Sequence, residues 1–177
     1  MKLPNEEIMY FFKTSVMVWL EKETKVVMGK LVESLWGLLE KGEAEKFARN
    51  LEEYITNASS YFDIGGKESE RVYKAFLLGM LSIAINGYEV ESEVESGYGR
   101  LDVVVYPREK RYGSYAAIFE VKRINKEEKL EEYARKAIEQ IKERAYYEKM
   151  VRKGFKVIGF GIAFAGKVAH VMVKKLK

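Results

Sequence analysis

Three charged residues fall on two neighbouring segments that both have the character of β-strands. Asp102 follows a glycine-rich turn and precedes three valines, and Glu120 and Lys122 end an apolar stretch that begins at Tyr115. Because side chains two residues apart on a strand share a face, Glu120 and Lys122 point the same way. If the two strands pair, Asp102 comes within reach of Glu120. Two carboxylates completed by water form the kind of site that Mg²⁺ occupies beside substrate phosphates, so these residues predict a hard-cation site.

Two carboxylates at such a site need a compensating positive charge. At ~4 Å their repulsion is about 1 kcal/mol in water and about 4 kcal/mol at an effective dielectric constant of 20. A cation or Lys122 must offset this repulsion, or one acid takes up a proton. The alternative is that Glu120 and Lys122 are ordinary exposed strand residues. The apolar residues 116–119 just before them weigh against that alternative, because charges rarely stand beside a core strand without a partner.

The composition excludes most other chemistry. The chain has no cysteine, which removes disulfides, thiolate zinc sites and cysteine nucleophiles. Its one histidine, His170, leaves no histidine-rich metal site, and we expect it to be structural. The pairs Gly97-x-Gly99 and Gly159-x-Gly161 lack the third glycine and the helix start of a dinucleotide-binding loop. Any chemistry must therefore come from carboxylates and lysines, with or without a hard metal ion.

The charge is unevenly distributed along the 177 residues. The net charge is +4, yet residues 142–177 carry ten basic and two acidic side chains, whereas residues 1–141 carry 21 basic and 25 acidic ones. This asymmetry is compatible with a surface that faces phosphates, and equally with a solvated surface rich in lysine and glutamate. Abundant lysine and glutamate without cysteine also fits a thermophilic source.

The hydrophobic pattern predicts helices first and then a mixed succession of strands and helix. An N-terminal helical extension over 1–60 and a core over 61–177 are expected, with a crossover helix that makes at least one strand pair parallel. The longest apolar run, residues 8–20, is interrupted by Lys13 and is too short for a bilayer, so we expect a cytoplasmic protein without a membrane partner. The predicted elements are helices over 6–21, 25–39, 43–57 and 68–86, a loop over 58–67, strands over 88–95, 101–106 and 115–121, one helix over 126–152, and strands over 155–165 and 167–173.

Several of these segments, in this order, resemble the PD-(D/E)XK nuclease superfamily. The closest resemblance is to the nuclease-like domain at the C-terminus of bacterial and archaeal AAA-ATPase-like proteins. The motifs that carry it are Glu95-Ser96-Gly97-Tyr98-Gly99-Arg100-Leu101-Asp102, Glu120-Val121-Lys122, Ala137-Ile138-Glu139-Gln140-Ile141 with Tyr146, Glu70-Arg71-Val72-Tyr73 on the first core helix, and Leu3-Pro4-Asn5-Glu6-Glu7 near the N-terminus.

The resemblance implies a restriction-endonuclease-like α/β fold with an αβββαβ core around a mixed central sheet. It also implies metal-dependent hydrolysis of phosphodiester bonds in nucleic acid, with DNA as the expected partner. Asp102 and Glu120 would hold Mg²⁺, with Mn²⁺ as a substitute, and Glu70 would add a third carboxylate. Lys122 would orient the attacking water or stabilise charge on the phosphate. Gln140 would help to place water or the metal shell.

Alternatives stand beside each of these expectations. Glu70 competes with Glu68 and could be a first-turn helix acid, and Gln140 could make a polar contact at the flank of its helix. The whole domain could be a non-catalytic nucleic-acid-binding or protein-interaction domain, accessory to an AAA-type ATPase. The sequence has no G-x-x-x-x-G-K-[ST] motif, so the chain is either a stand-alone relative or a fragment of a longer protein with an ATPase module. Double-strand cutting would favour a homodimer.

Overall fold

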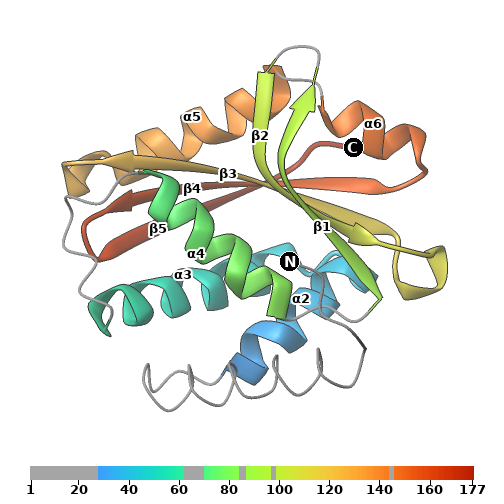
Figure 1. The fold of residues 1–177 in the computed structure, drawn as a ribbon, viewed down its shortest axis with the longest axis horizontal. Helices are drawn as coiled ribbons and strands as arrows, with labels where there is room; N and C mark the ends of the chain where they lie inside the picture. The colour runs from blue at the N-terminus through green and yellow to red at the C-terminus, as the bar shows by residue number, and fades with distance from the viewer. Residues whose placement is uncertain (1–27, 62–69, 84–86, 97–98, 144–145) are drawn as a thin grey trace, which may run out of the picture.

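In the part of the chain that the structure describes, five strands form one mixed sheet at the centre of the molecule. The computed structural model describes residues 28–61, 70–83, 87–96, 99–143 and 146–177, and Figure 1 shows their arrangement. The predicted helix over 6–21 lies outside the described residues, as do Gly97 and Tyr98 of the glycine-rich turn. The strands lie in chain order across the sheet. They are β1 (Tyr88–Ser96), β2 (Gly99–Pro107), β3 (Tyr115–Ile124), β4 (Lys156–Ala165) and β5 (Val168–Lys175).

The directions of the strands follow from the lengths of their connections. Neighbours β1 and β2, β2 and β3, and β4 and β5 run antiparallel, as short connections allow. Strands β3 and β4 run parallel, and the helical segment between them crosses from one end of the sheet to the other. The parallel pair predicted from a crossover helix is therefore confirmed, as is the α/β class with a mixed sheet.

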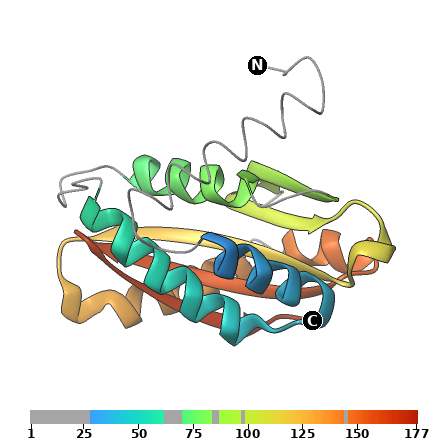
Figure 2. The ribbon, with the colours of Figure 1, turned by 90° about the horizontal axis from the view of Figure 1, so that it is seen from below.

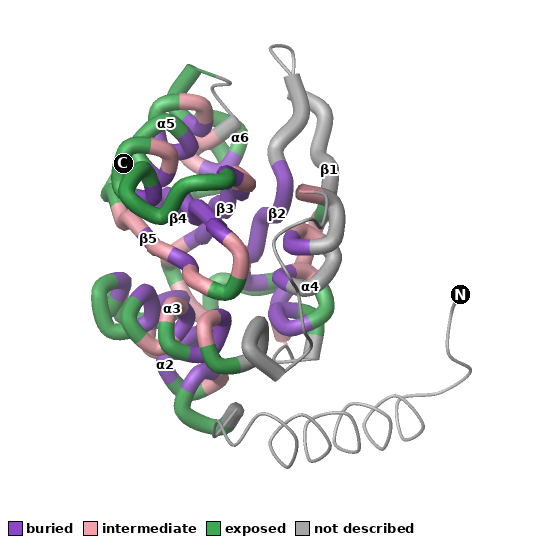
Figure 3. Tube along the Cα trace, turned by 90° about the vertical axis from the view of Figure 1, so that its left-hand side faces the viewer, coloured by how far each residue is buried: buried purple, intermediate pink, exposed green. Residues whose placement is uncertain are grey.

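Helices cover both faces of the sheet, as Figure 3 shows. One face packs against α2 (Met28–Lys41), α3 (Ala44–Tyr61) and α4 (Glu70–Ile83), and Figure 2 shows α2 and α3 crossing that face side by side. The other face packs against α5 (Leu130–Glu143) and α6 (Tyr146–Arg152). Among the described residues, no helix combines the length and the apolar character needed to cross a bilayer.

Two helix boundaries differ from the sequence prediction. Helix α3 continues to Tyr61, so the loop predicted over 58–67 is wrong at its start, since Ala58, Ser59 and Ser60 contain no residue that forbids helical angles. The single helix predicted over 126–152 is two helices, α5 and α6, on either side of residues 144–145, which lie outside the described residues. A short 3₁₀ turn, η2 (Glu127–Lys129), precedes α5. The apolar stripe of the segment does not reveal that break, because both helices present apolar residues to the same cluster.

Strand alternation distributes the core between the two faces. Val103 and Phe119 pack with α2, α3 and α4, whereas Val104 and Ile118 pack with α5. The Phe119 ring stacks on the Phe160 ring of β4, with centroids 4.9 Å apart. Strand β3 is thus buried on both faces, as expected for a central strand.

The described part of the predicted N-terminal extension packs directly on the sheet. Leu35 of α2 and Phe47 of α3 belong to the same buried cluster as the strands. Glu52 of α3 accepts the backbone amide of Val171 at 2.7 Å and lies 3.3 Å from Nδ1 of His170. The division into an extension over 1–60 and a core over 61–177 stays a prediction.

Gly161 of β4 allows α5 to lie close to the sheet beside Glu120, its register partner on β3. A Cβ atom at this position would lie 2.1 Å from the carbonyl oxygen of Ala134 in α5. Because that neighbour is backbone, the helix itself must move to admit a side chain. We expect Gly161→Val to lower the free energy of unfolding by at least ~1–3 kcal/mol, the usual range for overpacking. Thermal and denaturant unfolding measure this loss.

A glycine with open space provides the control for this substitution. At Gly79 of α4 no atom lies within 4 Å of the position that a Cβ would take. Gly79→Ala should therefore raise stability by roughly 0.5–1 kcal/mol through helix propensity alone. Equal effects of the two substitutions would contradict the close approach of α5.

Candidate metal-binding site

Strand β2 leaves strand β3 at Asp102. The β2–β3 ladder pairs Val103 with Phe119 and continues toward the other end of β2, whereas the β1–β2 ladder runs on to Gly99. Where the β2–β3 ladder ends, Oδ2 of Asp102 accepts the backbone amide of Val121 at 2.7 Å. A side-chain carboxylate thus takes the place of a strand carbonyl. Asp102 consequently lies at the opening of the sheet, with only 7% of its surface exposed.

The other oxygen of Asp102 contacts a lysine from α4. Nζ of Lys74 lies 2.6 Å from Oδ1 of Asp102 and 2.9 Å from Oε1 of Glu70, one helical turn before it. Glu70 also accepts the backbone amide of Arg123 at 3.4 Å. Burial lowers the pKa of Lys74, but the hydrogen bonds to Asp102 and Glu70 outweigh it and leave the pKa raised. The ion pairs of Lys74 and the hydrogen bond to Glu70 therefore connect the start of α4 to β2 and β3.

Glu120 and Lys122 form a second ion pair close by. Nζ of Lys122 lies 3.2 Å from Oε1 of Glu120, which is 1% exposed, while Lys122 is 22% exposed. Alternation along β3 places both on the face of Ala116 and Ile118, which pack against α5. The ion pair between these two side chains fits the shared face expected for them. Lys122 thus neutralises a buried carboxylate while part of its own side chain remains exposed to solvent.

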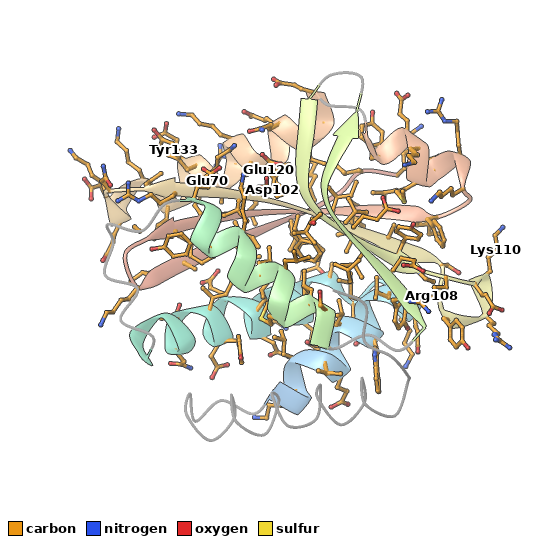
Figure 4. The ribbon with its side chains drawn as sticks, viewed as in Figure 1. Glu70, Asp102, Arg108, Lys110, Glu120 and Tyr133 are labelled. Carbon is orange, nitrogen blue, oxygen red and sulfur yellow. The ribbon has the colours of Figure 1, made fainter. Side chains whose placement is uncertain are left out.

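The structure brings the predicted acids into one region. The Asp102 carboxylate contacts the residue that follows Glu120, and Lys74 connects Asp102 to Glu70. Figure 4 shows Glu70, Asp102 and Glu120 together near the start of α4. Gln140 is half-buried on α5. The role expected for Gln140 stays a prediction.

The acids form ion pairs with lysines and are not arranged as a set of metal ligands. Across the ranges that the structure describes, no group of three or more Asp, Glu, His or Cys residues is arranged to hold a metal ion. Lys74 stands between Glu70 and Asp102 instead. Carboxylate oxygens are nevertheless the donors that a hard cation takes, and Asp102 and Glu120 are both buried. A divalent cation at these carboxylates would have to displace Lys74 or Lys122.

Sequence reasoning missed Lys74. The pair with Glu70 could have been predicted, because Lys74 follows Glu70 by four residues and Glu-to-Lys pairs at this spacing face each other on a helix. The contact with Asp102 had no such signal, since it joins residues 28 positions apart in the chain. Lys74 completes the candidate site.

Comparison with protein-family models agrees with this arrangement. The element order, the mixed sheet and the acids where two strands part define an α/β domain of restriction-endonuclease-like fold. Residues 68–174 match the model of the PD-(D/E)XK nuclease superfamily. Because the match covers more than half of the chain, the protein belongs to the PD-(D/E)XK nuclease superfamily. Comparison with curated proteins finds no significant match. The superfamily predicted from the sequence is confirmed, and the link to AAA-ATPase-like proteins stays a prediction.

Proposed function

We propose that the protein hydrolyses phosphodiester bonds of nucleic acid, with DNA as its substrate, in a metal-dependent reaction. The observation that carries this proposal is the Asp102 carboxylate at the opening between β2 and β3, bonded to the amide next to Glu120. Membership of a superfamily of nucleases supports the same activity. We place the reaction at Asp102, Glu120 and Lys122.

Asp102 and Glu120 would hold the Mg²⁺ ion, with Mn²⁺ as a substitute, and Glu70 is a candidate third ligand. Bound there, the ion supplies Lewis-acid polarisation of a phosphoryl oxygen and a lowered pKa for its water. The two acids have low exposure, which strengthens their attraction for a cation. Until that cation binds, Lys74 and Lys122 offset the cost of burying two negative charges.

Lys122 would position the water or stabilise charge on the phosphate. It is a cation paired with Glu120, so it is better suited to these roles than to removing a proton. Its partial exposure allows its ammonium to meet a phosphate that approaches from the solvent. Gln140 would contribute only if substrate or metal draws it toward the acids.

A plasmid-nicking assay with the full chain tests the proposed function. We expect nicking with Mg²⁺ or Mn²⁺, none with EDTA, and a loss of at least ~100-fold in the double variant Glu120→Gln/Lys122→Met. The matched control is Lys126→Met, because Lys126 is an exposed lysine four residues beyond Lys122. Nicking that persists in EDTA or in the double variant would refute the proposed mechanism.

The second candidate function is a non-catalytic nucleic-acid-binding domain that serves an AAA-type ATPase. The observation that favours it is the occupation of both buried acids by lysines, with no three-acid group in the described part of the chain. Mn²⁺ binding followed by electron paramagnetic resonance separates the two candidates. DNA binding without any bound Mn²⁺ supports this second function, whereas Mn²⁺ that is lost in the double variant supports the nuclease.

A further inference from the structure

Basic side chains gather at the end of the sheet opposite to the candidate site. Two separate segments contribute them: the β2–β3 connection with its 3₁₀ turn η1 (Lys110–Tyr112), and the end of α6 with the turn into β4. All six side chains are exposed. Figure 4 shows Arg108 and Lys110 at the far end of the molecule from Glu70, Asp102 and Glu120. We call this cluster the basic end; it consists of Arg108, Lys110, Arg111, Arg152, Lys153 and Lys156.

The fold, rather than the sequence, joins these two segments. The backbone amide of Lys156 donates to the carbonyl oxygen of Ser114 at 2.9 Å. The ammonium of Lys110 lies over Gly154, 3.0 Å from where a Cβ atom would stand. Gly154 has a positive φ of 87° and ends α6 with a hydrogen bond to the carbonyl oxygen of Val151. The charges of the two segments therefore form one surface.

Most of this positive charge is available to a ligand. Within the described residues, no carboxylate forms an ion pair with Lys110, Arg152, Lys153 or Lys156. Arg108 and Arg111 do pair with acids, but they are 59% and 68% exposed, and such surface pairs contribute little. An approaching polyanion can therefore replace those acids at small cost.

Aromatic rings hold two of the lysines in place. Nζ of Lys153 lies 4.3 Å from the ring centroid of Tyr106, and Nζ of Lys156 lies 5.4 Å from that of Tyr115. Burial, together with the hydrogen bond donated to Glu91, raises the pKa of Tyr106, so its ring stays neutral beneath the cation. A cation on a ring face keeps its remaining donors free for an anion. These two lysines are thus positioned before any ligand arrives.

The distance between the basic end and the candidate site suits a nucleic-acid backbone. Tyr115 and Glu120 are five residues apart on β3, which corresponds to about 17 Å at ~3.3 Å per residue. One strand of a duplex carries a phosphate every ~3.4 Å along the axis, so this span corresponds to about five nucleotides. Tyr106, beneath Lys153, packs on the α5 face of the sheet, the face to which alternation assigns Glu120. Tyr115, beneath Lys156, packs on the other face, so Lys153 is the ring-bound lysine on the side of Glu120.

The geometry points to a second nucleic-acid contact at the basic end, which binds phosphates about five nucleotides from the scissile bond. This inference rests on the proposed function and adds to it the surface that positions the substrate. Lysine and arginine contacts to phosphate fix the register of the ligand without reading its bases. The basic end therefore increases affinity for any sequence and determines how far the substrate must extend beyond the cut.

Binding of a 20-base-pair duplex to the full chain in EDTA, followed by fluorescence anisotropy over a range of salt, tests this inference. The variant replaces Lys110, Arg152, Lys153 and Lys156 by glutamine. A control of equal charge replaces four exposed basic residues on the other side of the sheet by glutamine, namely Lys30, Lys41, Lys46 and Arg49. We expect the basic-end variant to bind at least ~10-fold more weakly, with the slope of log K against log salt reduced by about 3–4, as four lost phosphate contacts require. The control should retain most of the affinity and slope.

The outcomes separate this inference from the proposed function. Equal binding by the two variants, with Mg²⁺-dependent nicking intact, overturns the second contact and leaves the nuclease standing. A wild-type chain that neither nicks nor binds DNA overturns both. Vesicles of phosphatidylserine provide a further comparison: if the basic-end variant loses vesicle binding but keeps duplex binding, the partner is an anionic membrane and the inference is wrong.

Discussion

Asp102→Asn is expected to reduce metal-dependent cleavage by at least ~100-fold in kcat/KM, the upper end of the loss seen when only the surroundings of a metal are changed. The asparagine side chain has nearly the same shape and can still accept the amide of Val121, as Asp102 does at 2.7 Å. It loses the negative charge that would attract the metal ion and that now holds Lys74. Single-turnover cleavage with Mg²⁺ and with Mn²⁺ measures the loss.

The fold should survive this substitution. Lys74 is 28% exposed and keeps Glu70 as a partner at 2.9 Å, so we expect the free energy of unfolding to fall by only about 1 kcal/mol. Glu53→Gln on α3 removes the same charge at an exposed position away from the site and should leave the rate unchanged. Wild-type cleavage by Asp102→Asn would show that the reaction does not use this carboxylate.

Lys74→Met is expected to have opposite effects on stability and on metal affinity. In EDTA the variant should lose about 2–3 kcal/mol of unfolding free energy, because Asp102, 7% exposed, loses its cation. With Mn²⁺ the variant should bind the metal about 10- to 100-fold more tightly, since the ion no longer competes with an ammonium at 2.6 Å and a hydrogen bond to a charged group contributes ~1.5–3 kcal/mol. Calorimetric titration and thermal unfolding with and without Mn²⁺ measure the two effects.

Lys74→Arg provides the control, because it keeps the cation at Asp102 and should keep the metal affinity low.

The contribution of Lys74 to stability depends on pH in a definite direction. Since the pKa of Lys74 is raised above 10.5 in the fold, its stabilising contribution is complete below pH 10.5 and is lost as the pH rises through the raised value. The stability difference between wild type and Lys74→Met should shrink over that alkaline range. Weaker Mn²⁺ binding by Lys74→Met would instead show that the lysine supports the metal.

Local patterns in the chain predicted the strands of the sheet and one parallel pair among them. The two-residue period places Glu120 and Lys122 on one face, and a short connection makes β2 and β3 antiparallel neighbours. Asp102 then lies beside β3, where its carboxylate accepts the amide of Val121, and its approach to the Glu120 carboxylate stays a prediction. The same patterns could not show where helix 126–152 divides, because a continuous apolar stripe is compatible with one helix or two.

Pattern and spacing by themselves determined the fold class, the order of the elements and the pair of strands that carries Asp102, Glu120 and Lys122. These features depend on interactions within a strand or between neighbouring strands, which repeat at fixed intervals along the chain. Only the tertiary structure decided that Lys74 stands between Glu70 and Asp102, and that Lys110 meets the end of α6. Those contacts join distant parts of the chain, and they exist because the two helical layers pack on opposite faces of one sheet.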